Sequence, residues 1–468
     1  MLARYIPDTD TLLFFSMLIM LFYLLIIVYV VYWFYYKFAD HGGDHACYII
    51  DFECYKPTDD RKLHADLASN MIMRIKNLDL KDLQFLWRVM LNSGIGGETY
   101  VPKSFVMGKE QSPTLSDGIL EMEDFFYHTL DKLFSKSSIS PSDIDVLVVN
   151  VSTFSPMPSL TTRMVNRYKM KEDIKTFNLS GMGCSASLIS INLVQNIFKS
   201  YKNQLALILT TESIVPNWYT GNDKSMMLTN LLFRSGGCAI LLTNRPNLKH
   251  KAMFRVKHLV RTHHGAHDDD YQCIAHKEDE DGYLGVSLSK TLPKVAGRAI
   301  TANLKELAPK ILPLRELLRY LLVTCLQKKA TMNFKTGIKH FVIHTGGKAV
   351  IEGIGKSLGL NDYDLEPSRS TLHRFGNTSA GSIWYVLAYM EAKKRLKQGD
   401  AILMISLGAG FKCNSCILEM VRDLSDENVW KDCITSYPAE AADSLFREKF
   451  GWLNHADPST FRKTVQVM

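Results

Sequence analysis

The sequence lacks the glycine-rich motifs with which many proteins hold nucleotides. Neither a P-loop pattern nor a G-x-G-x-x-G fingerprint occurs in its 468 residues. Long basic runs are also missing, because the two longest concentrations of positive charge, MEAKKRLKQ and NRPNLKHK, are short and contain no interleaved aromatic residues. We therefore predict no bound cofactor and no nucleic-acid partner. The net charge of +7 is compatible with attraction to anionic membranes or phosphate-bearing substrates.

The cysteines form neither a disulfide framework nor a zinc site. There are nine of them, an odd number scattered along the chain, which is typical of a reducing compartment. Cys413 and Cys416 make one C-x-x-C pair, but a zinc site would need a second pair, and no other pair has the spacing. We predict that these two cysteines are structural residues of a strand and that the protein binds no metal.

Charged residues are missing from Leu12–Tyr36, a run of 25 residues in which only Ser16 is neither apolar nor aromatic. A helix of about 20 such residues spans a bilayer. A secretory signal would have an apolar core of about 7–15 residues and a small-residue cleavage site, and neither is present. Aromatic residues gather at the carboxyl end of the run, as at a membrane interface: Tyr29, Tyr32, Trp33, Tyr35 and Tyr36. We predict one retained membrane-spanning helix within an anchor of residues 1–39.

The flanking basic residues predict the orientation of this anchor. Arg4 precedes the span, whereas Lys37, Lys56, Arg61 and Lys62 follow it. Because the side richer in Lys and Arg remains cytoplasmic, we expect the long remainder of the chain to face the cytosol.

Beyond residue 100, buried strands alternate with amphipathic helices. The expected strands are 143–152, 204–212, 236–244, 338–347 and 400–411, and the expected helices are 185–201, 348–360 and 382–396. This alternation is typical of an α/β protein with a mixed or parallel sheet.

The pattern also suggests an internal duplication. We predict a membrane-proximal segment at 40–100, a first α/β half at 101–247 and a second of similar make-up at 248–426. Residues 427–468 form a tail in which no pattern indicates a structure.

A candidate nucleophile lies in NLSGMGCSAS, where Cys184 follows Gly181 and Gly183 and begins a predicted helix. Glycine permits the positive φ of a sharp turn. The positive end of a helix dipole favours the thiolate, which is the reactive form of cysteine. The residues alone leave two interpretations open, a nucleophile and an inert cysteine in a tight turn.

Two candidate partners of this thiol lie in the second half. His344 ends an apolar strand just before a glycine pair, at the edge where α/β proteins build their sites. Asn377 stands between Gly376 and Thr378, where a helix N-cap is the alternative role.

These motifs resemble the plant 3-ketoacyl-CoA synthases, the condensing enzymes of very-long-chain fatty acid elongation. The stretches that carry the resemblance are NLSGMGCSAS, NWYTGNDKSMMLTNLLFRSGG, HTGGKAV, SRSTLHRFGNTSAGSIWYVLAYMEAKKRLKQGD and LGAGFKCNS. The resemblance covers about residues 40–426. It implies a thiolase-like duplicated α/β/α/β/α fold behind an N-terminal transmembrane helix, in the endoplasmic reticulum membrane.

The resemblance also implies a mechanism. Cys184 would take the acyl group from an acyl-CoA, and His344 and Asn377 would stabilise the enolate formed when malonyl-CoA loses CO2. Backbone N–H groups of Cys184 and of the Gly408–Gly410 loop would form the oxyanion hole. Other family histidines match His263, His340 and His373, for which we expect supporting roles. A homodimer, and association with the reductases and dehydratase of elongation, are expected as well.

The chain departs from the family pattern near the thiol. Ser180 and Ser187 replace glycines, and Val151 replaces a cysteine. Family members generally have two predicted N-terminal spans, whereas one is expected here. Two alternatives therefore stay open beside the condensing enzyme. One is a non-catalytic or weakly active paralogue that binds acyl-CoA or an active synthase, and the other is a type III polyketide synthase.

Overall fold

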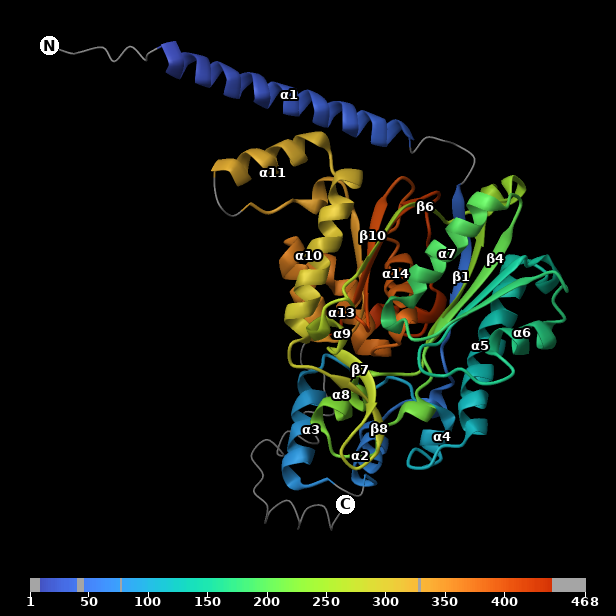
Figure 1. Ribbon diagram of the computed structural model, residues 1–468. Helices are drawn as coiled ribbons and strands as arrows, with labels where there is room; N and C mark the ends of the chain where they lie inside the picture. Colours follow the sequence, from blue (N-terminus) through green and yellow to red (C-terminus); the bar gives the residue numbers. More distant parts are fainter. Residues whose placement is uncertain (1–8, 40–45, 76–77, 327–329, 440–468) are drawn as a thin grey trace.

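The computed structural model describes residues 9–39, 46–75, 78–326 and 330–439. Its first element is the long helix α1 (Thr9–Ala39), which contains the predicted span. Within the described ranges, α1 alone is long and apolar enough to cross a membrane, with a mean hydropathy of 2.8 over Leu13–Tyr32. Its described side chains are mostly exposed, and it lies along one end of the molecule (Figure 1).

The remainder is built on a nine-stranded sheet in the order β3-β2-β4-β5-β1-β6-β11-β10-β9. The strands are β1 (Cys47–Cys54), β2 (Val146–Asn150), β3 (Lys175–Leu179), β4 (Leu205–Thr211), β5 (Gly237–Thr243), β6 (Phe254–His263), β9 (His340–Ile343), β10 (Ala401–Gly408) and β11 (Lys412–Met420). A separate hairpin pairs β7 (Ile274–Glu278) with β8 (Leu284–Leu288).

The strand order is nearly a palindrome about the centre of the sheet. In the first half β2 runs parallel to β4, β4 antiparallel to β5, and β5 antiparallel to β1. In the second half the same relations join β9 to β10, β10 to β11, and β11 to β6. The central strands β1 and β6 pair antiparallel with each other. β1 therefore belongs to the first repeated unit, although sequence analysis placed residues 40–100 in a separate membrane-proximal segment.

The helices complete five layers (Figure 1). The central layer is α7 (Ala186–Ser200) and α14 (Ser382–Ala392), which pack between the strands of the two halves. The outer layer on the first half contains α5 (Leu115–Ser137) and α6 (Leu160–Tyr168). The outer layer on the second half contains α10 (Leu292–Ile311), α12 (Lys348–Leu358) and α13 (Asp362–Phe375). This is the expected α/β/α/β/α arrangement.

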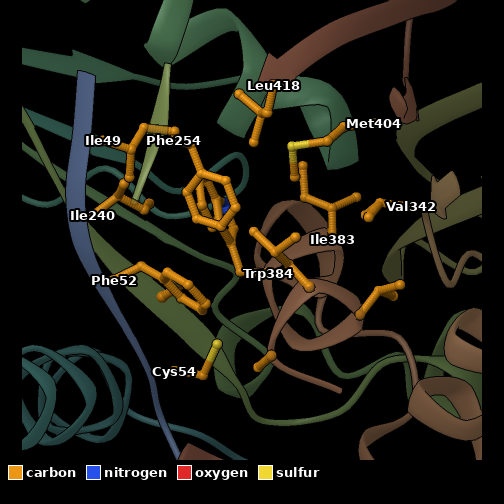
Figure 2. Close-up of a cluster of buried hydrophobic side chains, with 14 of the residues drawn as sticks. Ile49, Phe52, Cys54, Ile240, Phe254, Val342, Ile383, Trp384, Met404 and Leu418 are labelled. Atoms are coloured by element: carbon orange, nitrogen blue, oxygen red, sulfur yellow. The ribbon is translucent and has the colours of Figure 1, made fainter. Parts of the chain in front are cut away.

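Alternation along the strands explains the layering. Val146 and Val148 of β2 face the central helices, whereas Leu147 and Val149 face the outer helices. Successive strand side chains point to opposite faces, and sheets covered on both faces are apolar throughout. Figure 2 shows the central core around Trp384 of α14, with Phe52 and Ile240 of the first half on one side and Met404 of the second half on the other.

Shorter helices cover one end of the sheet, opposite α1 (Figure 1). They are α2 (Ala65–Met73), α3 (Leu80–Asn92), α4 (Lys103–Val106) and α8 (Lys224–Leu232), and they share a small apolar core with one another. Two further helices connect to the second half, α9 (Asp268–Tyr271) and α11 (Leu314–Leu326).

The segment after residue 426 is more ordered than its sequence indicated. Trp430 is fully buried, and its indole Nε1 donates to the carbonyl of Tyr385 over 3.1 Å. Tyr437 stacks edge-on against Trp430 and bonds His373 through its hydroxyl. The first part of the predicted tail is thus part of the core, and residues 440–468 lie outside the described ranges.

Candidate active site

The three predicted catalytic residues line one large cavity. Its volume is about 1360 Å³, above the roughly 300–1,000 Å³ of ordinary small-molecule sites. Cys184 comes from the first half of the fold, and His344 and Asn377 come from the second half. The walls contain apolar side chains from α3, α8, α10, α12 and the β7–β8 hairpin: Phe85, Leu228, Ile274, Val286, Leu288, Leu292, Ala296, Ile300, Val350 and Ile354.

Cys184 lies in a tight turn, Gly183–Ser185, directly before α7. Gly181 and Gly183 have φ values of +66° and +63°, which favour glycine. A side chain at Gly183 would meet the backbone nitrogen of Ala409 at 2.7 Å, because the Gly408–Gly410 loop packs directly against this turn. The prediction of a sharp turn before a helix is confirmed, and the loop expected to supply an oxyanion donor lies beside it.

Ser379 and Glu212 are neighbours of the thiol that sequence analysis missed. The Ser379 hydroxyl lies 3.5 Å from the Cys184 sulfur and 3.4 Å from Glu212 Oε2. Glu212 also accepts from the backbone nitrogens of Ser152 and Thr153 and from the Thr153 hydroxyl. Glu212 could have been predicted from the sequence, because it is a carboxylate directly after the apolar run that forms β4.

Burial disfavours the thiolate form of Cys184. The pKa of this thiol is raised to about 12, mainly because the sulfur is buried, while the Ser379 hydroxyl lowers the pKa and the Glu212 carboxylate raises it. The helix start was expected to favour the thiolate, but removing the sulfur from water outweighs that effect. At neutral pH the unliganded protein therefore holds a protonated thiol.

His344 follows β9 and is buried, with 3% of its surface exposed. Burial lowers its pKa to about 4, so the ring is neutral at physiological pH. Its Nδ1 lies 2.6 Å from the hydroxyl oxygen of Ser382, at the start of α14. When this hydroxyl donates to Nδ1, the ring proton is on Nε2, and Nε2 can donate into the cavity.

Asn377 is held by its backbone on both sides. Its N–H donates to the carbonyl of Leu232, and its carbonyl accepts from Arg234. The side-chain oxygen accepts from the backbone nitrogen of Ser379 over 2.9 Å. This bond occupies the amide oxygen, so the amide nitrogen is the atom that can donate toward a ligand.

Comparisons with known proteins agree with this geometry. Residues 41–330 match the family described as FAE1/Type III polyketide synthase-like protein, and residues 330–420 match the C-terminal part of 3-oxoacyl-[acyl-carrier-protein] synthase III. Two relatives from Arabidopsis thaliana, 3-ketoacyl-CoA synthase 12 and 3-ketoacyl-CoA synthase 3, are each 55% identical to this chain. Each alignment covers 91% of this chain and 95% of the relative.

The chain belongs to the 3-ketoacyl-CoA synthase family. It is thus a condensing acyltransferase, as the sequence resemblance implied.

Solved structures share the fold of this 3-ketoacyl-CoA synthase family member. The polyketide synthase PKS-I of the brown alga Ectocarpus siliculosus superposes with a TM-score of 0.64 at 16% identity, over 80% of this chain and 98% of its own. The C-terminal type III polyketide synthase domain of Steely1 from Dictyostelium gives a TM-score of 0.61 at 17% identity, over 80% and 99%. The expected thiolase-like α/β fold is confirmed.

Only one of the three family-matched histidines, His263, lines the cavity, as do Gly408 and Gly410. The Nδ1 of His263 accepts from the backbone nitrogen of Gly265. His340 is at the other end of β9 and bonds Asp400 over 3.0 Å. His373 is near the end of α13 and bonds Tyr437. Neither His340 nor His373 is part of the cavity lining.

The two serines that replace family glycines have different surroundings. Ser187 is fully buried, and its hydroxyl accepts from the indole Nε1 of Trp384 over 2.7 Å. Ser180 is exposed. Ser187 therefore bonds the central layer of this synthase-family fold, and neither serine is part of the cavity lining.

Cys413 and Cys416 lie on β11 as predicted, buried and unpaired. Among the residues that the structure describes, no group of three His, Cys, Asp or Glu side chains is arranged to hold a metal ion.

Proposed function

We propose that this chain condenses a long-chain acyl-CoA with malonyl-CoA, giving a 3-ketoacyl-CoA two carbons longer and CO2. The observation that carries this proposal is the meeting of Cys184, His344 and Asn377 in one cavity of a 3-ketoacyl-CoA synthase family member. Identity of 55% over most of the chain favours this activity over polyketide synthesis, because the polyketide synthases share only the fold at 16–17% identity.

The first half-reaction transfers the acyl group to Cys184. The sulfur attacks the thioester carbonyl, the bond to the CoA sulfur breaks, and the thiol proton leaves on CoA-SH. The negative charge that develops on the carbonyl oxygen is stabilised by backbone N–H groups of Cys184 and of the Gly408–Gly410 loop. Each such donor contributes about 3 kcal/mol to transition-state stabilisation.

The second half-reaction uses His344 and Asn377. Malonyl-CoA loses CO2, and the electrons of the broken C–C bond form an enolate of acetyl-CoA. A neutral His344 donating from Nε2 and the amide nitrogen of Asn377 stabilise the enolate oxygen. The enolate carbon attacks the acyl thioester, Cys184 leaves as thiolate, and a proton restores the thiol.

The composition of the walls supports a long apolar acyl group. Side chains such as Phe85, Leu228 and Ile300 line a space that a hydrocarbon chain fills with a gain of about 0.8 kcal/mol per buried CH2. Lys290 and Lys348 also line the cavity, where a phosphate-bearing substrate such as CoA is attracted to positive charge.

The protein is anchored in the endoplasmic reticulum membrane with its catalytic part in the cytosol. The exposed apolar surface of α1 supports the anchor. The nine cysteines are all free, which suits the reducing cytosol. We further propose that it acts as a homodimer beside reductases and a dehydratase, because a 3-keto group must be reduced and dehydrated before another elongation cycle.

Microsomes that contain this protein test the activity directly. Supplied with labelled malonyl-CoA and saturated acyl-CoAs, they should form a product two carbons longer, and Cys184→Ala should abolish it. Cys325→Ala is the matched control, because it removes a thiol that is exposed and outside the cavity.

Three results would count against the proposal. Product formation by the Cys184→Ala variant would show that Cys184 is not the nucleophile. Cyclised or aromatic products would indicate a polyketide synthase. No product with any chain length, from protein shown to be folded, would indicate a non-catalytic paralogue.

A further inference from the structure

The carboxyl-terminal half of α11 exposes large apolar side chains, which an ordinary surface helix turns toward the core. Leu321 and Leu322 are 48% and 49% exposed, and Leu326 is 84% exposed. Cys325, between them, is also exposed. Leu318, Leu322 and Leu326 follow one another at four-residue spacing, so they form a continuous stripe along the helix.

A salt bridge fixes the helix in this rotation. Glu316 is 4% exposed and accepts two hydrogen bonds from the guanidinium of Arg319, at 2.7 and 2.6 Å. The same carboxylate accepts from the backbone nitrogen of Asn333, and Arg319 donates to the carbonyl of Thr331. Leu317, the next residue, is also buried, and together these contacts keep the leucine stripe turned outward.

The position of α11 indicates what covers it. Figure 1 shows α11, the start of β1 and α1 at the same end of the molecule. Ala39 ends α1 and Cys47 begins β1, so eight Cα steps join them, which is at most about 28 Å. A bilayer that holds α1 is therefore close to this end. α1 itself is not the cover, because the leucines are exposed with α1 in place.

We propose that α11 lies in the surface of the lipid bilayer that holds α1, with its leucine stripe among the upper acyl chains. Arg315 is exposed on the same face, seven residues before Leu322, and it meets anionic headgroups near the amino end of the helix. Arg319 is exposed as well, but its guanidinium already bonds Glu316. This proposal rests on the membrane anchoring proposed above.

Contact of α11 with the bilayer also fixes the position of the cavity relative to the membrane. α10 leads directly into α11 through Pro313, and Leu292, Ala296 and Ile300 of α10 line the cavity. Two contacts with the bilayer, through α1 and α11, fix the orientation of the catalytic part relative to the membrane.

Quenching by brominated lipid tests this contact in the full chain, reconstituted in vesicles of phosphatidylcholine with a fraction of phosphatidylserine. Cys325 is labelled with an environment-sensitive fluorophore in a Cys184→Ser background. We expect brominated phosphatidylcholine to remove about half of its emission, since such helices enter the bilayer by about 5–10 Å. Leu322→Glu with Leu326→Glu should restore most of the emission.

The matched control carries the label on α3, at the opposite end of the molecule (Figure 1). It combines Lys81→Cys, an exposed position, with Cys325→Ser, and its emission should not change with brominated lipid. Retention of the protein after alkaline carbonate extraction tests the anchor separately.

An unquenched Cys325 label in protein that resists carbonate extraction overturns the proposal for α11 and leaves the anchor standing. Release of the protein by carbonate overturns both. Emission that depends on protein concentration and not on brominated lipid shows that a second copy of the chain covers the stripe, which also overturns the proposal.

Discussion

The hydroxyl of Ser379 donates to the sulfur of Cys184 over 3.5 Å, and this bond joins the two halves of the fold at the candidate nucleophile. Ser379 has a φ of +54°, a conformation that serine rarely adopts. The Asn377 side chain holds this conformation by accepting from the Ser379 backbone nitrogen. The same short segment thus presents a hydrogen bond to the thiol and an amide to the cavity.

Glu212 and Ser379 should have opposite effects on the pKa of the Cys184 thiol. Glu212→Gln removes a negative charge that raises the Cys184 pKa, so that pKa should fall and alkylation at a fixed pH should become faster. Ser379→Ala removes a hydrogen bond that lowers the pKa, so alkylation should become slower. A change of one pKa unit corresponds to about a tenfold change in rate. The measurement is the pH dependence of iodoacetamide incorporation at Cys184, read by peptide mass spectrometry.

Glu212→Gln is a conservative change in this setting. Gln can keep an oxygen for the donors from Ser152 and Thr153 while placing NH2 toward the Ser379 hydroxyl. Slower alkylation in Glu212→Gln would contradict the charge effect and would indicate that the carboxylate helps to remove the thiol proton.

Ser382→Ala should impair the second half-reaction more than the first. Without the hydroxyl 2.6 Å from Nδ1, the His344 ring loses the contact that keeps its proton on Nε2. Loss of one donor to a developing oxyanion costs about 10²-fold in rate. Acylation of Cys184, followed by intact-protein mass spectrometry, should persist while condensation with malonyl-CoA declines. An equal loss of both steps would indicate a general disturbance of the site.

The His344 pKa of about 4 also has a consequence for pH dependence. The neutral ring is the active form in this mechanism, and it is lost only as the pH falls through 4. Between pH 6 and 8 the condensation rate of the pre-acylated enzyme should therefore show no inflection from His344. An inflection near pH 6.5 that disappears in His344→Asn would contradict a neutral donor.

Ser187→Ala should destabilise the fold and leave the chemistry intact. The buried indole of Trp384 would lose its acceptor, and an unsatisfied buried donor costs about 1–3 kcal/mol of unfolding free energy. Ser180→Ala, the exposed serine of the same motif, is the matched control and should change the stability by less than about 0.5 kcal/mol. Thermal unfolding in detergent gives the comparison. A large loss of turnover in Ser187→Ala below its unfolding temperature would show that Ser187 acts on the reaction.

Met157 should lie in the contact of a homodimer. Its side chain is 95% exposed, the highest value among the large apolar residues described. The loop that carries it follows Ser152 and Thr153 of the cavity lining. Met157→Asp should convert a dimer to a monomer, as measured by light scattering in detergent. Leu115→Asp, at another exposed apolar position, should not. Equal masses for the wild type and Met157→Asp would exclude this contact.

Local pattern determined much of the fold. The segments predicted as strands at 143–152, 204–212 and 400–411 contain β2, β4 and β10. Short, continuous apolar runs of this length are typical of strands that are buried on both faces. The predicted helix at 185–201 is α7, which begins at Ala186. In these segments short-range periodicity and tertiary burial favour the same structure.

Other features depended on contacts between distant segments. β1 occupies the centre of the sheet through pairing with β5 and β6, about 190 and 207 positions later. Trp430 and Tyr437 order the segment after 426 by packing on α14 and α13, although no local periodicity marks it.

The sequence by itself determined the long apolar helix, the α/β pattern and the choice of Cys184, His344 and Asn377 as candidates, because these depend on composition, spacing and motif. Only the tertiary structure decided the thiol's charge and its neighbours. Glu212 and Ser379 reach Cys184 from positions 28 and 195 residues away. Their influence on its pKa arises from burial and distance in space, which no local pattern in the chain encodes.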